Sequence, residues 1–263
     1  MSLLLRSELR LRVGARRCQA DLWRPGLRTR ASASAVAEGE GDIVAEALSL
    51  LAGRGAKLPS QATVVLEDEL LYYALLPAVH LWGAASDPAR HYFADVLGER
   101  ELRVSASLSP CGRRWMAVAV ETAVLGDVTE HLARHGVALK RVGPALFEDL
   151  HALKQRLPDD GVVVWVRDQG LMAMRRHGGG WVEMHWDRCD SWQPEVVSAQ
   201  VDAAMYRHTL EAATPPGQRV PVLVVAQRGE QASRLAPAAA LHGWTLCRLR
   251  TRRQARARRE RLV

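Results

Sequence analysis

The segment GVVVWVRDQGLMAMRRHGGGWVEMHW, residues 161–186, decides the fold of this chain. It contains three apolar runs, which are separated by short gaps at 168–170 and 178–180. Gaps rich in Asp and Gly between apolar runs are typical of tight turns that join antiparallel strands. The segment therefore predicts a three-stranded β-meander in the second half of the chain.

The elements around this meander follow an order that occurs twice. After the meander, hydrophobic periodicity predicts helix, strand, helix and strand at 195–210, 220–226, 230–242 and 244–249. The first half begins with strands at 9–13, 18–23 and 27–29, a helix at 43–52 and a strand at 62–66. It continues with strand 70–76, helix 86–97, strands 102–108 and 115–120, a long helix ending at 136, strand 137–142 and a helix at 144–157.

Two polar segments of the first half are predicted to lie outside these elements. Residues 31–41, ASASAVAEGEG, are small and polar and predict a loop. The acidic triplet Glu67-Asp68-Glu69 follows a strand and predicts a solvated turn rather than a catalytic pair of carboxylates.

The repeated order predicts an α/β protein with two lobes, each with a mixed sheet of a meander plus parallel strands, flanked by helices. We expect the first lobe at 1–143, with a small inserted subdomain at about 68–114. The second lobe is expected at 144–249, followed by a basic tail at 250–263.

Composition excludes several classes of protein. Hydrophobic residues make up 48% and charged residues 25% of the 263 residues, which is typical of a globular chain and not of collagen-like or disordered ones. The longest apolar runs are far shorter than the ~18 residues that a transmembrane helix needs. Four cysteines without a C-x-x-C pair predict no disulfide framework and a cytosolic location.

The net charge of +7 comes from the C-terminal end. Residues 248–261 contain eight arginines and one acid, so the rest of the chain is close to neutral. Such a tail is either a solvated end or a contact with anionic lipid or nucleic acid. We expect no specific nucleic-acid partner, although an adaptor that binds nucleic acid through this tail is a weaker alternative.

Three segments carry a resemblance to a known family. They are ATVVLEDELLYYALLPA (62–78) with the helix around Phe93, the block RRWMAVAVETAVLGDVTEHLARHGVALKRVGPALFEDLHALKQRL (113–157), and the second meander. Together they resemble the cytoplasmic domain of the type II secretion inner-membrane protein L and its relative, pilus assembly protein M. The resemblance covers about 9–249 and implies an actin-like (ribonuclease H-like) fold, as in actin, heat-shock chaperones and sugar kinases.

Active members of this superfamily bind Mg-ATP at two Asp-x-Gly turns, and this sequence departs from that pattern. The first hairpin has Gly14 and Arg16 but no carboxylate to hold the metal. The second offers Asp168 and Gly170, which we interpret as an ordinary hairpin turn. No adenosine-binding Gly-Gly element is evident at 226–229. Gly14, Arg16, Asp168 and Gly170 are therefore vestigial candidates for a nucleotide site. We expect no catalytic residue, no bound metal and no cofactor.

The resemblance implies a non-catalytic scaffold at the cytoplasmic face of a bacterial inner membrane. Its implied partners are a bitopic inner-membrane protein of a pilus or secretion machine and the hexameric assembly ATPase. An interlobe cleft or an edge strand would receive a peptide. The alternative is an active, ATP-binding member of the actin superfamily.

Overall fold

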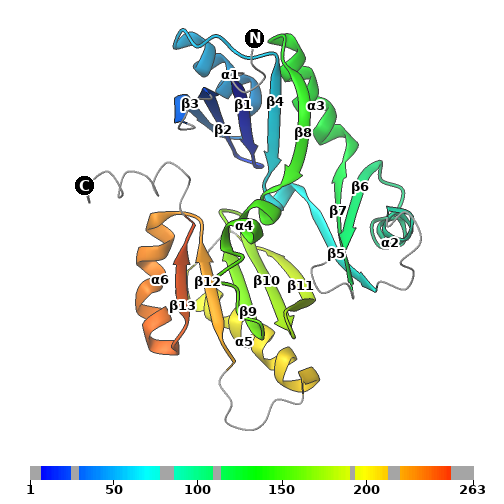
Figure 1. The fold of residues 1–263 in the computed structure, drawn as a ribbon, viewed down its shortest axis with the longest axis vertical. Helices are drawn as coiled ribbons and strands as arrows, with labels where there is room; N and C mark the ends of the chain where they lie inside the picture. The colour runs from blue at the N-terminus through cyan, green and yellow to red at the C-terminus, as the bar shows by residue number, and fades with distance from the viewer. Residues whose placement is uncertain are drawn as a thin grey trace.

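The computed structural model describes residues 7–24, 30–77, 86–108, 114–189, 193–212 and 220–249. Within these ranges the strands form two five-stranded sheets and one three-stranded sheet (Figure 1). The two larger sheets lie one above the other in this view, and the small sheet lies to one side. Residues 250–263, where the basic tail is expected, lie outside the described residues.

The first large sheet has the strand order β3-β2-β1-β4-β8. Strands β1 (Glu8–Val13), β2 (Arg17–Arg24) and β3 (Arg30–Glu38) form an antiparallel meander. Strand β4 (Gln61–Leu66) pairs parallel with β1, and β8 (Ala138–Pro144) pairs parallel with β4. The sheet is therefore mixed, as the sequence predicts.

Strand β3 corrects the prediction of a loop at 31–41. The segment has low β propensity because it is built from Ala and Ser, yet it pairs with β2 along its length. Ala35 and Ala37 are buried, and α1 (Ile43–Gly53) packs against the strand. Small side chains let the helix approach closely, so tertiary packing overrides local propensity here. The third strand expected at 27–29 lies outside the described residues.

Two helices and one sheet face build the core of the first lobe. Strand β1 alternates between buried and less buried positions, which places Leu9 and Leu11 on one face. Helix α1 contributes Leu48 and Leu51 to that core, and α3 (Thr122–Arg134) contributes Leu132. The Asp42 side chain accepts a hydrogen bond of 3.1 Å from the Ala45 N–H and so caps the start of α1.

The small sheet is inserted between β4 and α3. It contains β5 (Tyr72–Pro77), β6 (Leu102–Leu108) and β7 (Arg114–Glu121) in the antiparallel order β5-β7-β6. A short 3-10 helix, η2 (Asp68–Leu70), precedes it, so the strand predicted from residue 70 begins two residues later. Helix α2 (Ser86–Leu97) covers the sheet and buries Phe93 against it.

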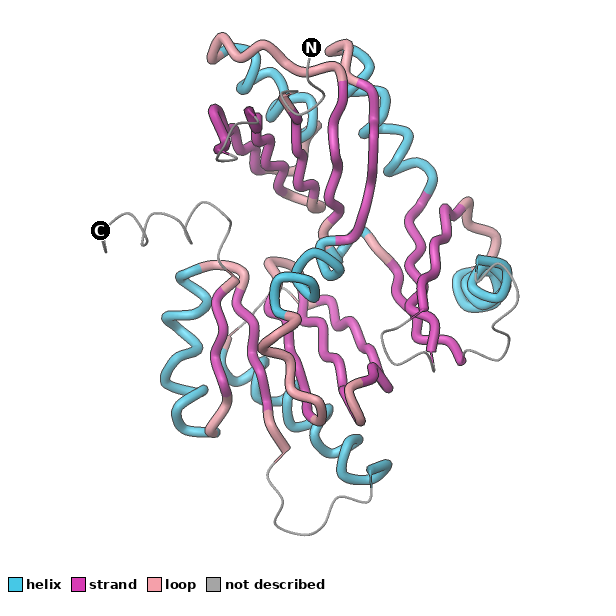
Figure 2. The backbone as a smooth tube through the Cα atoms, in the orientation of Figure 1, coloured by secondary structure: helices cyan, strands magenta, loops and turns pink. Residues whose placement is uncertain are grey.

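The second large sheet repeats the order of the first, as β11-β10-β9-β12-β13. Its meander is β9 (Gly161–Val166), β10 (Gly170–His177) and β11 (Gly180–Arg188). Strands β12 (Val222–Ala226) and β13 (Thr245–Arg248) pair parallel beside β9. Helices α5 (Pro194–Ala212) and α6 (Gly229–His242) flank this sheet (Figure 2).

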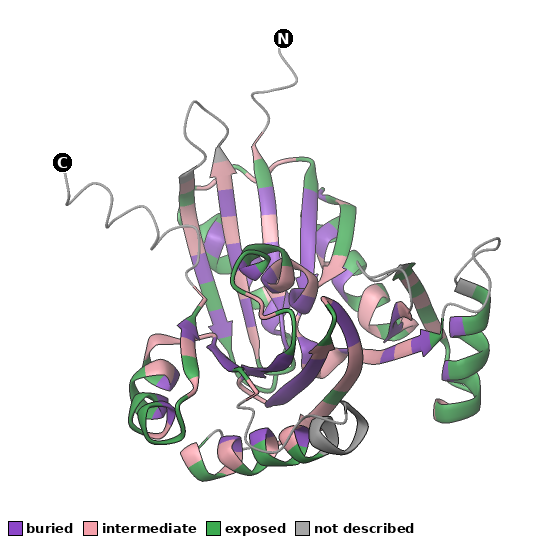
Figure 3. Cartoon of the chain, turned by 60° about the horizontal axis from the view of Figure 1, so that its bottom comes forward, coloured by how far each residue is buried: buried purple, intermediate pink, exposed green. Residues whose placement is uncertain are grey.

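Helix α4 (Ala145–Leu153) connects the two lobes and is shorter than the helix predicted to reach residue 157. It buries Leu146 and Leu153 against one face of the second sheet, beside Trp165. Helix α5 covers the other face through Val197. Strand β9 is consequently buried at every position (Figure 3).

Among the described helices, none has the length together with the apolar character that crossing a bilayer requires.

Candidate functional site

The ends of the central strands of both large sheets meet at one place in the molecule. In α/β sheets with parallel strands, ligands bind outside the carboxyl ends of those strands, so this place is the candidate site. Eight residues there form the interlobe charge network: Glu67, Asp68 and Glu69 after β4, Arg167 and Asp168 after β9, Gln227 and Arg228 after β12, and Asp149 of α4.

The centre of the interlobe charge network is Arg167. Its Nε donates a hydrogen bond of 2.6 Å to Oδ2 of Asp68, and both side chains are fully buried. Its Nη1 lies 2.6 Å from Oδ2 of Asp149. One guanidinium of the second lobe is thus held between a carboxylate of the first lobe and one of the connecting helix.

Asp68 also accepts a hydrogen bond of 2.6 Å from the Tyr73 hydroxyl. Burial and the neighbouring Asp68 charge raise the pKa of Tyr73 well above its usual value. Burial also raises the pKa of Asp149, although the Arg167 charge opposes that rise. The ion pairs of Arg167 therefore lie in a desolvated environment, where loss of one partner is costly.

Glu67 links the first lobe to the second through Gln227. The Gln227 amide donates a hydrogen bond of 2.9 Å to Oε1 of Glu67, and Arg12 of β1 pairs with the same carboxylate. Burial alone would raise the pKa of Glu67, but the Arg12 charge and hydrogen bond outweigh burial, so the net shift is downward. Glu67 is therefore ionised and bound from both lobes.

The Glu69 carboxylate, from η2, reaches the turn between β1 and β2, where the resemblance places a phosphate-binding turn. The Ala15 N–H donates a hydrogen bond of 3.2 Å to Oε1 of Glu69. A Cβ added at Gly14 would lie 2.5 Å from the same oxygen, so glycine leaves room for this carboxylate. Burial and the Glu67 charge raise the pKa of Glu69 to about 7. A side chain of the protein thus uses an amide that would otherwise be available to an anion.

Arg16 does not join this group. Its guanidinium lies 3.1 Å from Glu40, and both side chains are exposed. Its neighbour Arg17 pairs with Glu38 of β3 at 3.3 Å. The first hairpin therefore directs these two arginines toward carboxylates of the first lobe.

Asp168 and Gly170 lie in the turn between β9 and β10, which the Arg167 N–H closes by donating 2.9 Å to the Gly170 carbonyl. Asp168 pairs with Arg228, the residue before α6, and accepts a longer hydrogen bond of 3.5 Å from Gln231. Burial raises the pKa of Asp168 while the Arg228 charge opposes that rise. At Gly170 a Cβ would lie 2.4 Å from the Asp187 carbonyl oxygen, so this glycine permits close packing of β11.

The site contains more carboxylates than cations. Five carboxylates (Glu67, Asp68, Glu69, Asp149 and Asp168) face three guanidiniums, those of Arg12, Arg167 and Arg228. Every one of these guanidiniums is already paired with a carboxylate. Within the described ranges, no cluster of three or more His, Cys, Asp or Glu side chains has an arrangement that could hold a metal ion.

Comparison with solved structures identifies this architecture. A structure of a PilM-PilN type IV pilus biogenesis complex matches with a TM-score of 0.62 at 14% identity, over 92% of this chain and 88% of the other. A Bacteroides thetaiotaomicron protein with actin-like ATPase fold and unknown function matches with a TM-score of 0.59 at 9% identity, over 94% and 93%.

The chain has the actin-like fold. The cytoplasmic domain of EpsL, an inner-membrane component of the type II secretion system of Vibrio cholerae, also matches, with a TM-score of 0.53 at 14% identity over 89% of this chain and 95% of that domain. No protein-family model and no curated protein sequence matches the chain. The actin-like fold that the resemblance implies is therefore confirmed.

The prediction that Glu67-Asp68-Glu69 forms a solvated turn is wrong. Asp68 is fully buried and Glu67 is bound from two sides. A sequence signal existed, because both the acidic triplet and Arg167 directly follow apolar strands. Their pairing was not evident because the two positions lie 99 residues apart.

Proposed function

We propose that this chain is a non-catalytic actin-like adaptor at the cytoplasmic face of a bacterial inner membrane, in a type IV pilus or type II secretion machine. It would dock a bitopic membrane protein and the hexameric assembly ATPase. The observation that carries the non-catalytic part is the Glu69 carboxylate, which reaches from η2 to the β1–β2 turn and accepts a hydrogen bond from the Ala15 amide. The likeness to PilM and EpsL supports the choice of machine.

The interlobe charge network gives this proposal a physical basis. Actin-like enzymes hold their lobes around a nucleotide, whereas here Arg167 and Gln227 tie the lobes directly to Asp68 and Glu67. The two lobes would then form one rigid body without a ligand. A rigid body with fixed surfaces suits an adaptor that must hold two partners at once.

The test is binding to the membrane protein encoded next to this chain, measured by pull-down with the full chain and by bacterial two-hybrid assay. We expect capture of that protein through its cytoplasmic end, and capture of the assembly ATPase in a separate arm. Failure of both arms with folded protein would overturn the adaptor role. Multiple turnover of ATP by purified chain would overturn the non-catalytic part.

The basic tail at 250–263 is proposed to contact anionic lipid. Six of the eight C-terminal arginines lie beyond Thr251, and an arginine near an anionic surface contributes about 1 kcal/mol. Co-sedimentation with phosphatidylglycerol vesicles should therefore decrease with salt and be lost when residues after Leu249 are removed. Equal binding of the truncated chain would contradict this contact.

A further inference from the structure

Strand β3 has one unpaired edge. It is the outermost strand of the order β3-β2-β1-β4-β8, and its partner within the described residues is β2. An unpaired edge presents a row of free backbone donors and acceptors to other chains.

The register shows which backbone groups of β3 face outward. The Gly39 N–H donates to the Arg16 carbonyl at 3.0 Å, so in this antiparallel ladder the odd-numbered residues of β3 bond to β2. This alternation holds from Ala33 to Glu38, before the register shifts opposite Leu22 and Trp23, so the N–H and C=O groups of Ser34 and Val36 point to the free edge. The Ser34 carbonyl shows this directly, because it accepts a hydrogen bond from Arg54.

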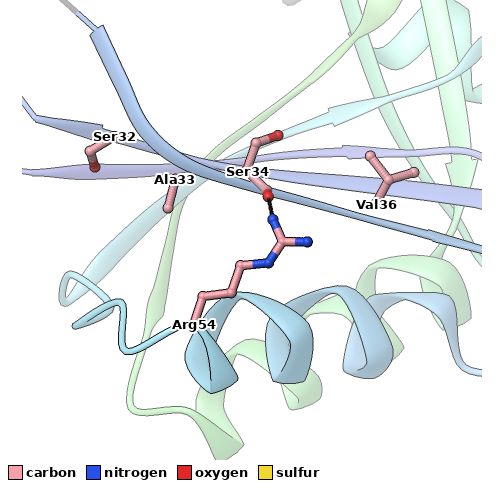
Figure 4. A pocket seen from close by; sticks show the side chains of 5 residues that line it. All are labelled: Ser32, Ala33, Ser34, Val36 and Arg54. Atoms are coloured by element: carbon pink, nitrogen blue, oxygen red, sulfur yellow. Dashed lines mark hydrogen bonds between the residues drawn. The ribbon is translucent and has the colours of Figure 1, made fainter.

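These outward groups border a surface hollow of about 670 Å³. Figure 4 shows Arg54 at the end of α1 reaching across the hollow to Ser34, with Ser32 and Val36 along the same strand. The small side chains leave the backbone accessible. Charged side chains and prolines commonly protect an edge from pairing, and residues 33–37 contain neither; the register irregularity of the strand lies before them, at Ser32.

Arg54 adds a charge to this edge. No carboxylate lies within ion-pair distance of it in the part of the chain that the structure describes, and it donates a hydrogen bond to the neutral Ser34 carbonyl. A guanidinium has five donors, so those not used by Ser34 remain available to a carboxylate. The edge thus combines main-chain groups with one unbalanced positive charge.

We propose that the β3 edge accepts an extended, proline-free peptide of a partner protein as an added strand, with an Asp or Glu side chain that binds Arg54. Main-chain hydrogen bonds to Ser34 and Val36 would supply affinity, and Arg54 would supply selectivity. A second copy of this chain is a poor occupant, because antiparallel pairing of two β3 edges would bring two Arg54 side chains together. The inference deepens the proposed adaptor function by naming a docking surface and the chemistry of its partner.

The test uses a phage-displayed library of random peptides of about twelve residues, panned on the full chain. We expect enrichment of acidic, proline-free sequences with alternating small or β-branched residues. A labelled selected peptide, titrated by fluorescence anisotropy, should bind Arg54→Glu about tenfold more weakly and Lys57→Glu within about twofold of the wild type. Lys57 is the matched control because it is an exposed cation three residues further along.

Backbone recognition is tested from both sides. Ser34→Pro removes an outward N–H without breaking the ladder to β2, and should abolish peptide binding while melting close to the wild type. If that variant misfolds, the same peptide N-methylated at alternate amides should lose binding to the wild-type chain.

Any of three results would overturn the inference. Panning could enrich no peptide, or the selected peptide could bind Arg54→Glu as tightly as the wild type while its N-methylated form also binds unchanged. Sedimentation velocity could also show a dimer of the wild-type chain that Ser34→Pro abolishes. The outcome is separable from the adaptor role. If the membrane protein binds wild type and Ser34→Pro equally, the adaptor role stands and the β3 site fails. If peptides bind at the β3 edge but neither the membrane protein nor the assembly ATPase is captured, the β3 site stands and the adaptor role fails.

Discussion

Arg167 and Asp68 form an ion pair of 2.6 Å between the two lobes, with side chains 1% and 0% exposed. The pair joins residues that follow the central strands of two different sheets. Asp149 of the connecting helix lies against the same guanidinium. The lobes of this chain are therefore joined by its own charges at the carboxyl ends of their central strands.

Removal of the central cation should strongly destabilise the protein. Arg167→Met leaves Asp68 and Asp149 buried without a positive partner, which costs about 3–5 kcal/mol in the free energy of unfolding. Urea denaturation followed by tryptophan fluorescence measures this loss. The matched control is Arg134→Met, which breaks an exposed pair with Glu130 and should cost less than about 1 kcal/mol. Equal losses of stability in the two variants would contradict a stabilising role for the buried ion pairs of Arg167.

Glu69 should give the protein a pH-dependent stability. Its pKa rises from 4.5 in the unfolded chain to about 7 in the folded protein, so the folded state holds the proton more tightly. Stability from this group is present below about pH 4.5 and is lost as pH rises through about 7. Glu69→Gln, measured by urea denaturation at pH 5 and pH 8, should gain about 1–3 kcal/mol over the wild type at pH 8 and little at pH 5. A gain that is independent of pH would contradict this assignment.

Gly14 and Glu69 should be energetically coupled. Gly14→Ala places a methyl group 2.5 Å from the Glu69 carboxylate, so the carboxylate must move and lose its Ala15 amide. We expect a cost of about 1–2 kcal/mol in the wild type and a smaller one in a Glu69→Ala background. Thermal melts of the four proteins of this double-mutant cycle give the coupling. Simple additivity would show that the carboxylate does not fill the turn.

The small sheet should unfold apart from the two large ones. Phe93 of α2 is 2% exposed, and Phe93→Ala removes about 3–5 kcal/mol of packing. Hydrogen exchange should then accelerate in α2, β6 and β7 and remain slow in β9 and β10. This outcome would support the inserted subdomain predicted from the sequence. Uniform acceleration would show instead that the chain unfolds as one unit.

The sequence was sufficient for the fold because two meanders followed by alternating helices and strands leave few arrangements. It was insufficient for β3, since an Ala and Ser segment has no local strand signal until it pairs with β2 and packs on α1. The interlobe charge network was also missed. Asp68, Asp149 and Arg167 are ordinary polar residues in the sequence, and only the fold brings each of the two carboxylates within 2.6 Å of the Arg167 guanidinium.

The measurement that tests the central claim most directly is the melting temperature of the full chain with and without about 5 mM Mg-ATP. Because the Glu69 carboxylate fills the first turn and the guanidiniums of Arg12, Arg167 and Arg228 are already paired, we predict a shift below about 1 °C. A saturable rise of several degrees, abolished by leaving out magnesium, would mean that the interlobe charge network opens to bind a nucleotide and does not take its place.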